Sequence, residues 1–536
     1  MILGSPDAQE TMTTASPGGP TLTDLFARAC AGHPDAVALA DAANAGRSSG
    51  GERPVRRLTF AEADRIISVI AAQLQQLGLK TDHVVALQMP NTVEAVLTLL
   101  GILRAGMIAA PMPLLWRRAE AVAALSRIGA KAIVAFGAVG DVHLPELATH
   151  VAADVFPIRA VCAFGRDLPD GVVPFEPLLE DDLFAAPEIV EPARGLHDRA
   201  AHVAVITWDM TAAGPLPVAR SHSELLVAGL AATLEGAMTP GAAIVSTLLP
   251  SSLAGLATGL LPWLATGGTL CLHPVFDGEV LAAQLADENP GALVVPGPLA
   301  SRLAETGILA AATDLHSVIA VWRTPERLPG SPEWREAKPG LVDLQAFGEI
   351  GLIAARRGRD GRPAPVALGP VVVPRQTANG GVLVAELSRT AAGTLAFRGP
   401  MTPRFCYPPG AERGDPPFLK LDETFFIDTG FSCRAGPDGG PMMVTAPPTG
   451  LVAIGGYRVP LSVFRRIIAE VDAGATLTAL PDRLTGQRLA GSSADGEALR
   501  QTLVRRGVNP LIVGAFRERS AGAAASGPAT RLRQAG

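Results

Sequence analysis

The chain alternates apolar residues at helical spacing with short, continuous apolar runs. Residues 59–79 (TFAEADRIISVIAAQLQQLGL) show the helical spacing, and residues 83–89 (HVVALQM) follow as a compact run of strand length. The same order of helix and then strand recurs at 91–106 with 107–113, and again within 119–136. Such alternation predicts an α/β fold, in which helices cover both faces of parallel sheets and ligands bind near the carboxyl ends of the strands.

One long uncharged stretch needs a separate interpretation. Residues 236–276 contain no Asp, Glu, Lys or Arg, and part of this stretch is apolar enough to suggest a membrane span. However, Pro250, Pro262 and several glycines divide it into pieces of strand or helix length. We therefore expect it to form buried core, and we predict no transmembrane segment.

The pattern changes in the last third of the chain. After Gly369 the apolar runs become short strands separated by Gly and Pro, which predicts a small β-barrel-like subdomain. A Pro-rich linker, TAPPTG at 445–450, precedes a compact α+β unit. The predicted organisation is a disordered N-terminus at 1–20, a large N-terminal domain at 21–445, a small C-terminal domain at 446–516 and a disordered tail at 517–536.

Composition narrows the function classes. In 536 residues, 48% are hydrophobic and 18% charged, which indicates a well-buried core. The net charge of -6 provides no basic surface for nucleic acid, so nucleic acid is not an expected partner. The N-terminus lacks a secretory signal and the five cysteines are scattered, which favours a cytoplasmic protein with free thiols. Only four lysines occur, at positions 80, 131, 338 and 420.

Eight short segments occur in an order that resembles one superfamily, the AMP-forming acyl-CoA synthetases, adenylation domains and luciferases. The resemblance covers about residues 21–516, and it implies two parallel-sheet α/β subdomains, a small β subdomain and a small C-terminal domain. The segments are RRLTFAEADR, VVALQMPNTVEAVLTLLGILRAGMIAAPMP, ITWDMTAAGPLPVARSHSEL, LLPWLATGGTLCLHPVFD, LQAFGEIGL, GTLAFRGP, FIDTGF and IGGYRVPL.

The resemblance implies a two-step reaction. A carboxylate attacks the α-phosphate of ATP to give an acyl adenylate, and coenzyme A then displaces AMP. The expected cofactors of an active member are ATP, Mg²⁺ and coenzyme A, and the expected partners are a small carboxylate or an acyl thioester, including one carried by acyl carrier protein. This chemistry needs donors around the phosphates and a magnesium ligand.

The phosphate loop of the family corresponds to ITWDMTAAGPLPVARSHSEL. Family members carry small hydroxyl residues, glycines and a lysine here, whereas this chain has Trp208, Asp209 and Met210, and the lysine position is Leu216. Only Thr211 is retained as a candidate phosphate ligand. The added negative charge and bulk favour a segment that packs instead of one that holds a triphosphate.

The family's magnesium segment corresponds to LQAFGEIGL. Phe347 and Gly348 match the family's aromatic residue and glycine, so both are candidate nucleotide-binding residues. If this chain lacks two residues relative to the family, Glu349 aligns with the family's magnesium-binding glutamate and becomes the catalytic magnesium ligand. If the segments align without a gap, Glu349 is an ordinary loop carboxylate. Upstream, Trp322 and Arg323 are expected to fill or stack across the adenine pocket.

The family's ribose-binding segment corresponds to FIDTGF. Thr429 and Gly430 match, but Phe431 replaces the aspartate that would bind the ribose hydroxyls. Asp428 is a candidate substitute if the backbone shifts. Successive strand residues alternate faces, so the direction of its side chain is open.

Two glycines near the C-terminus have two interpretations. Gly455 and Gly456 match a hairpin that borders the pantetheine tunnel in relatives, where missing side chains would admit the thiol arm. Alternatively, a tight hairpin needs glycine for its backbone angles. No lysine follows Lys420, so the family's adenylation lysine is absent.

These substitutions lead to one functional prediction with an alternative. We predict an acyl-CoA-synthetase-like protein whose adenylation half-reaction is weakened or lost. If that half-reaction is lost, the protein is expected to bind no nucleotide. The alternative is a non-catalytic pseudoenzyme that binds acyl-CoA or acyl carrier protein, or that regulates a partner.

Overall fold

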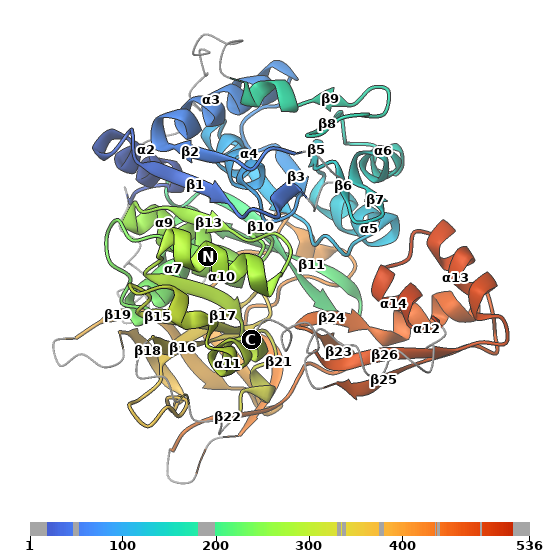
Figure 1. The fold of residues 1–536 in the computed structure, drawn as a ribbon. Coiled ribbons are helices and arrows are strands. Elements are labelled where there is room, and N and C mark those ends of the chain that lie inside the picture. Colours follow the sequence, from blue (N-terminus) through green and yellow to red (C-terminus); the bar gives the residue numbers. More distant parts are fainter. Residues whose placement is uncertain are drawn as a thin grey trace.

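The computed structural model describes residues 19–46, 53–180, 199–329, 334, 339–374, 380–434, 436, 440–482 and 485–517. Apart from residues 19, 20 and 517, the two segments predicted to be disordered lie outside the described residues. Three large sheets, a two-stranded β-hairpin and their helices form a large unit at residues 19–446, and a smaller C-terminal unit follows at residues 451–516 (Figure 1).

A seven-stranded sheet has the order β11-β10-β4-β3-β5-β8-β9, and its pairs are parallel except for the antiparallel pair of β10 and β11. Helix α3 begins at a capping box, in which the Thr59 hydroxyl accepts from the Glu62 N–H and the Glu62 carboxylate accepts from the Thr59 N–H. The strands of this sheet, with the helices and the separate β6–β7 hairpin that occur among them in the chain, are α3 (Phe60–Gln76), β3 (Val84–Gln88), α4 (Val93–Arg104), β4 (Ile108–Pro111), α5 (Arg118–Ile128), β5 (Ala132–Ala135), β6 (Ala138–Val139), β7 (Val142–His143), α6 (Leu144–Asp154), β8 (Ala160–Ala163), β9 (Val173–Pro174), η2 (Glu176–Leu179), β10 (Val203–Thr211) and β11 (Gly214–Ser221).

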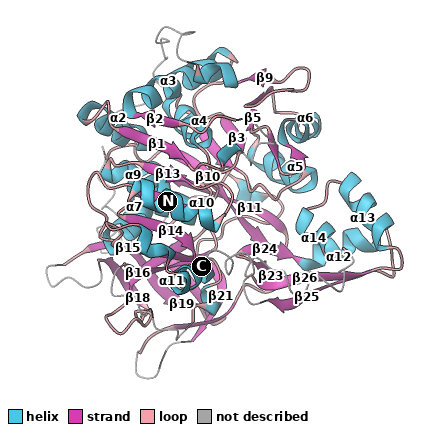
Figure 2. Ribbon diagram, in the orientation of Figure 1, coloured by secondary structure: helices cyan, strands magenta, loops and turns pink. Residues whose placement is uncertain are grey.

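An eight-stranded sheet has the order β17-β16-β15-β14-β12-β13-β1-β2, with antiparallel pairs at both edges and parallel pairs between them. Figure 2 shows helices covering these sheets. The elements are α2 (Leu22–Gly32), β1 (Val37–Asp41), β2 (Arg57–Thr59), α7 (His222–Glu235), β12 (Ile244–Ser246), α8 (Leu253–Gly255), η3 (Leu256–Leu260), α9 (Leu261–Thr266), β13 (Leu270–Leu272), α10 (Gly278–Glu288), β14 (Ala292–Pro296), α11 (Gly297–Thr306), η4 (Ile308–Ala311), β15 (Ser317–Trp322), η5 (Pro325–Arg327), β16 (Gly340–Phe347) and β17 (Gly351–Arg356).

The uncharged stretch forms buried core, as predicted. Its middle part is divided into the short helical segments α8, η3 and α9, whose side chains lie almost entirely inside the large unit. Among the described residues, no helix has the length and apolar character needed to cross a membrane.

The third sheet is antiparallel, with the order β18-β19-β20-β21-β22, and its buried side chains join the core of the large unit. The predicted α/β fold with a small β subdomain is thus confirmed. Its strands are β18 (Gly369–Val373), β19 (Val382–Arg389), β20 (Thr394–Arg398), β21 (Ile427–Arg434) and β22 (Met443–Ala446), with η6 (Ala411–Arg413) between β20 and β21.

The C-terminal unit is built around a hydrophobic core of its own, which includes Val459, Ile468, Leu503 and Ile512. It packs beside the hairpin of β10 and β11, and strand β24 contacts β10 directly (Figure 1). Its elements are β23 (Leu451–Ile454), β24 (Tyr457–Pro460), α12 (Leu461–Ala469), β25 (Thr476–Asp482), β26 (Gly486–Ser492), α13 (Gly496–Arg505) and α14 (Pro510–Gly514).

Candidate functional site

A small cavity lies at the junction of the two units. Its volume is about 80 Å³, and its walls come from β10, from the end of β16 and the residues after it, and from the start of β24. Three of the predicted site residues line it, namely Gly348, Glu349 and Gly456. The junction therefore brings together the segments that the resemblance assigns to phosphate, magnesium and pantetheine binding.

The expected phosphate loop is a β-hairpin. Strands β10 and β11 pair continuously up to Thr211 and Gly214, which leaves Ala212 and Ala213 as a two-residue turn. The Thr211 hydroxyl donates to the Gly214 carbonyl at 2.9 Å and accepts from the Ala213 N–H at 3.1 Å. Both hydrogen-bonding roles of this hydroxyl are thus used within the turn, and Thr211 does not line the cavity.

Bulky side chains fill the space beside this hairpin. The indole of Trp208 is buried and meets Trp116 edge to face, with ring centroids 5.4 Å apart. Tyr457 of the C-terminal unit also lines the cavity, and its hydroxyl accepts from Asn509 Nδ2 at 3.1 Å. These rings reduce the open volume between the units.

A buried ion pair joins the two units. Asp209 Oδ1 accepts from Arg458 Nη1 at 2.7 Å, and the side chains are only 11% and 9% exposed. Gly348 makes room for this carboxylate, because a Cβ at that position would lie 2.4 Å from Asp209 Oδ2. With its φ of +62°, Gly348 also has a backbone conformation that favours glycine.

The aromatic residue at the ribose position is part of the core. Phe431 is buried and packs edge to face against Phe347, with centroids 5.4 Å apart, and Phe347 in turn packs against Phe397 at 5.2 Å. The guanidinium carbon of Arg458 lies 4.8 Å from the centroid of the Phe431 ring. Phe347 therefore supports the site from behind and does not line the cavity.

Glu349 is held by a backbone donor and by an arginine. Its Oε2 accepts from the Leu253 N–H at 2.6 Å, and its Oε1 accepts from Arg323 Nη2 at 3.3 Å. Burial raises the pKa of Glu349, and the positive charge of Arg323 opposes this shift. Within the described ranges, no cluster of three or more His, Cys, Asp or Glu side chains is arranged to hold a metal ion. The role of Glu349 as a magnesium ligand stays a prediction.

Alternation along β21 separates the predicted ribose residues. Thr429 is buried, and its hydroxyl donates to the Leu395 carbonyl at 2.7 Å. Asp428 is exposed, and its carboxylate accepts from the Thr394 hydroxyl at 2.9 Å and from the Gly430 N–H at 2.8 Å. Asp428 thus lies on the opposite face of the strand from Phe431. None of Asp428, Thr429 and Gly430 lines the cavity.

The two C-terminal glycines form a tight turn between β23 and β24. Their φ values are +57° for Gly455 and +84° for Gly456, as a two-residue hairpin turn of this type requires. A Cβ on Gly456 would lie 2.6 Å from the Cβ of Arg323. Turn geometry and close packing therefore account for both glycines, while their role beside a pantetheine arm stays a prediction.

Trp322 packs within the large unit, and its expected role at an adenine pocket stays a prediction. Its indole is buried, donates to Asp343 Oδ1 at 2.9 Å and packs on Gly297, where a Cβ would lie 2.3 Å from the ring. The neighbouring Arg323 lines the cavity.

Comparison with known proteins identifies the family. A family model described as AMP-binding enzyme matches residues 26–348, which is more than half of the chain.

The chain belongs to the AMP-binding enzyme family.

Individual relatives are distant. The chain is 30% identical over 131 residues to the beauvericin nonribosomal cyclodepsipeptide synthetase BEA1 of Gibberella fujikuroi, which covers 24% of this chain and 4% of that protein. It is 29% identical over 189 residues to long-chain fatty acid transport protein 1 of Homo sapiens, which covers 34% of this chain and 27% of that protein. The matches thus span well under two thirds of these relatives.

Solved structures support the family's fold over nearly the whole chain. The apo structure of MbtA from Mycobacterium smegmatis matches with a TM-score of 0.63 and 20% identity, covering 95% of this chain and 93% of that one. At this level of identity the match shows the fold alone.

Two charged residues at the junction of the two units, Arg458 and Glu326, were not predicted from the sequence. Arg458 lies within IGGYRVPL, and Glu326 lies three residues after Arg323. One signal was available for Arg458: Asp209 adds a carboxylate to an apolar strand, and a buried carboxylate needs a cation or several donors. The position of that cation, 249 residues further along the chain, was not visible in the local pattern.

Proposed function

We propose that this chain is an acyl-CoA-synthetase-like member of the AMP-binding family in which ATP-dependent activation of a carboxylate is lost or severely weakened. The observation that carries the proposal is the ion pair of Asp209 and Arg458, which occupies the junction next to a cavity of only about 80 Å³. Sites for small molecules and cofactors usually have about 300–1,000 Å³.

The charges at the junction support the same proposal. A triphosphate needs N–H donors and cations, but the hairpin places the Asp209 carboxylate there and carries no lysine. Of the cations that line the cavity, Arg458 is paired with Asp209 and Arg323 with Glu349. The residues present therefore do not fit ATP with Mg²⁺, and we derive no catalytic step through them.

The expected loss of rate is large. Removing one preorganised donor from a site that stabilises developing charge costs about 3 kcal/mol. The phosphate-loop lysine, the ribose aspartate and the C-terminal lysine are all missing from their family positions. Even with strong non-additivity, losing such groups together would slow adenylation by several powers of ten.

A protein that has lost ATP-dependent catalysis would act by binding a ligand. We propose that its ligand is an acyl carboxylate or an acyl thioester, carried by coenzyme A or by acyl carrier protein. Similarity to a protein named for long-chain fatty acid transport supports an acyl ligand, and similarity to nonribosomal synthetases supports a small carboxylate. A role in fatty acid metabolism and a location in the cytoplasm belong to this proposal.

Two assays test the proposal. Exchange of labelled pyrophosphate into ATP, with fatty and aryl acids as substrates, should stay at the buffer level, while an active acyl-CoA ligase run in parallel shows exchange. Thermal shift should show no stabilisation by ATP with Mg²⁺ and a rise in Tm with palmitoyl-CoA, because a ligand that binds the folded state stabilises it. Exchange above buffer would instead show that adenylation survives and would overturn the proposal.

A further inference from the structure

Two groups of the large unit contact the guanidinium of Arg458, and an acidic side chain lies nearby. Asp209 on β10 accepts a hydrogen bond from Nη1 at 2.7 Å, and Phe431 on β21 presents its ring at 4.8 Å from Cζ. Glu326 in η5 makes no direct ion pair with Arg458 among the described contacts, but it lies near enough for the charge of Arg458, together with that of Arg327, to lower the pKa of its carboxyl against the larger, raising effect of burial. Arg458 comes from β24, so the C-terminal unit inserts one side chain into a pocket formed by the large unit.

The hydrogen bonding around this guanidinium is incomplete. Among the described residues, Arg458 Nη2 and Glu326 Oε2 are both buried without a hydrogen-bond partner. A guanidinium carries five N–H donors and a carboxylate can accept several bonds, so each group retains unused capacity. One buried carboxylate oxygen near Arg458 is thus left to accept a further donor.

Two other arginines near the pocket are engaged elsewhere. Arg323 is paired with Glu349, and Arg220 donates to the backbone carbonyls of Glu349 and Ile350 and to that of Met401. Without Arg458, the Asp209 carboxylate would therefore be buried without the cation that it pairs with here. Two carboxylates and the face of an aromatic ring together attract a cation and repel an anion.

We infer that Asp209 and Phe431, with Glu326 nearby, form a binding site for a guanidinium or primary ammonium group, and that Arg458 fills this site as an internal occupant. A cationic ligand competes with Arg458 for the Asp209 carboxylate and the face of the Phe431 ring. Its binding displaces β24 and so changes how the C-terminal unit sits against the large unit. This inference rests on the proposed function, because a triphosphate and these two carboxylates would repel each other.

The test empties the site and refills it with a small cation. Arg458→Ala should lower Tm, and ethylguanidinium at concentrations on the order of millimolar should restore part of the loss, as expected for so small a ligand. Ethylurea, which has a similar shape but no charge, should restore nothing. The double variant Asp209→Asn with Arg458→Ala should not respond to ethylguanidinium. Arg506→Ala, which removes an exposed arginine paired with Glu470 in the same unit, is the matched control and should not respond either.

The outcomes separate the inference from the proposed function. If Arg458→Ala is folded by circular dichroism and ethylguanidinium gives no rise in Tm beyond that with ethylurea, the cation site is wrong. If Arg458→Ala does not fold, Arg458→Lys and Arg458→Gln replace it: the site predicts that Lys keeps a higher Tm than Gln, and equal values would overturn it. Stabilisation of the wild type by ATP with Mg²⁺ would contradict the proposed function, whatever the response to ethylguanidinium.

Discussion

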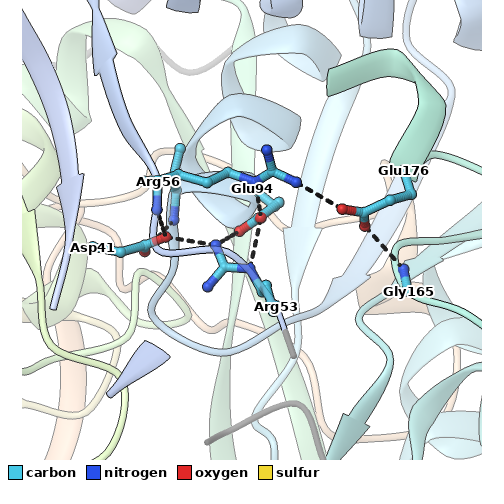
Figure 3. A network of polar contacts seen from close by, with 7 residues as sticks. Asp41, Arg53, Arg56, Glu94, Gly165 and Glu176 are labelled. Carbon is cyan, nitrogen blue, oxygen red and sulfur yellow. Dashed lines mark hydrogen bonds and ion pairs between the residues drawn. The ribbon is translucent and has the colours of Figure 1, made fainter. Parts of the chain in front are cut away.

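Two buried clusters of charge hold this molecule together, and they are built differently. The first lies inside the large unit, where Arg53 and Arg56 connect Asp41, Glu94 and Glu176 (Figure 3). The second lies between the units, where Asp209 and Arg458 form one ion pair next to Glu326. Both clusters are largely buried, so their difference lies in how many bonds their charges make.

The first cluster distributes its bonds over several elements. Glu94 Oε1 accepts from the Nε atoms of Arg53 and Arg56, both at 2.7 Å. Asp41 Oδ1 accepts from the Val93 N–H at 3.1 Å at the start of α4, and Glu176 Oε2 accepts from the Gly165 N–H at 3.1 Å. Strand β1, helix α4 and the segment around η2 are thereby fixed to one another.

Both clusters leave buried polar atoms without a hydrogen-bond partner, namely Arg53 Nη1 in the first and Arg458 Nη2 and Glu326 Oε2 in the second. Each such atom costs about 1–3 kcal/mol. The first cluster offsets this cost with bonds to several elements of one unit, whereas the second has a single ion pair between the units. Burial alone therefore does not make a charged cluster structural, and the number of bonds that its charges make separates the two.

Glu94→Ala should have the largest effect, because it leaves Arg53 and Arg56 buried without their shared acceptor. We expect a loss of about 3–5 kcal/mol in the free energy of unfolding, the usual cost of removing one partner of a buried ion pair. Urea unfolding followed by circular dichroism measures it. Glu94→Gln retains one acceptor oxygen and should cost less than Glu94→Ala. A loss below about 1 kcal/mol for Glu94→Ala would show that this cluster is not structural.

Asp209→Asn should cost less, about 1–3 kcal/mol, because the amide oxygen still accepts from Arg458 and the Phe431 ring stays beside the guanidinium. Urea unfolding of Asp209→Asn, Arg458→Gln and the double variant gives their coupling free energy. The double variant should lose less than the sum of the two single variants. Strict additivity would mean that the ion pair contributes nothing to the junction.

The sequence predicts the helices and strands of the large unit better than it predicts the contacts at the junction between the units. Alternating helices and strands, and the division of the uncharged stretch by Pro250 and Pro262, follow from local spacing and were confirmed. The hairpin of β10 and β11 was expected to be a loop, since the resemblance placed a phosphate loop there, yet its strands pair along their length. The partners of Asp209 and Glu349 could not be predicted, because both contacts join residues far apart in the chain.

Gly348→Ala should have a smaller effect that depends on Asp209. The left-handed backbone at this position costs a residue with a side chain about 1–2 kcal/mol. The new methyl group would also press on Asp209 Oδ2. In the background of Asp209→Ala, only the backbone cost should remain. Urea unfolding of the two single variants and the double variant separates the two parts, and an equal cost in both backgrounds would mean that the carboxylate is not constrained by Gly348.

Arg506→Ala should have the smallest effect and sets the baseline for the junction. The ion pair of Arg506 and Glu470 lies on the C-terminal unit at 3.1 Å, and its side chains are 43% and 59% exposed. Water already solvates both charges, so we expect a change of about 0–0.5 kcal/mol in the free energy of unfolding. Because Arg506 and Arg458 belong to the same unit, the difference between their variants isolates the effect of burial at the junction. If Arg506→Ala and Arg458→Gln destabilised the protein equally, the loss of a positive charge from this unit would explain both results, and the buried pair with Asp209 would have no special role.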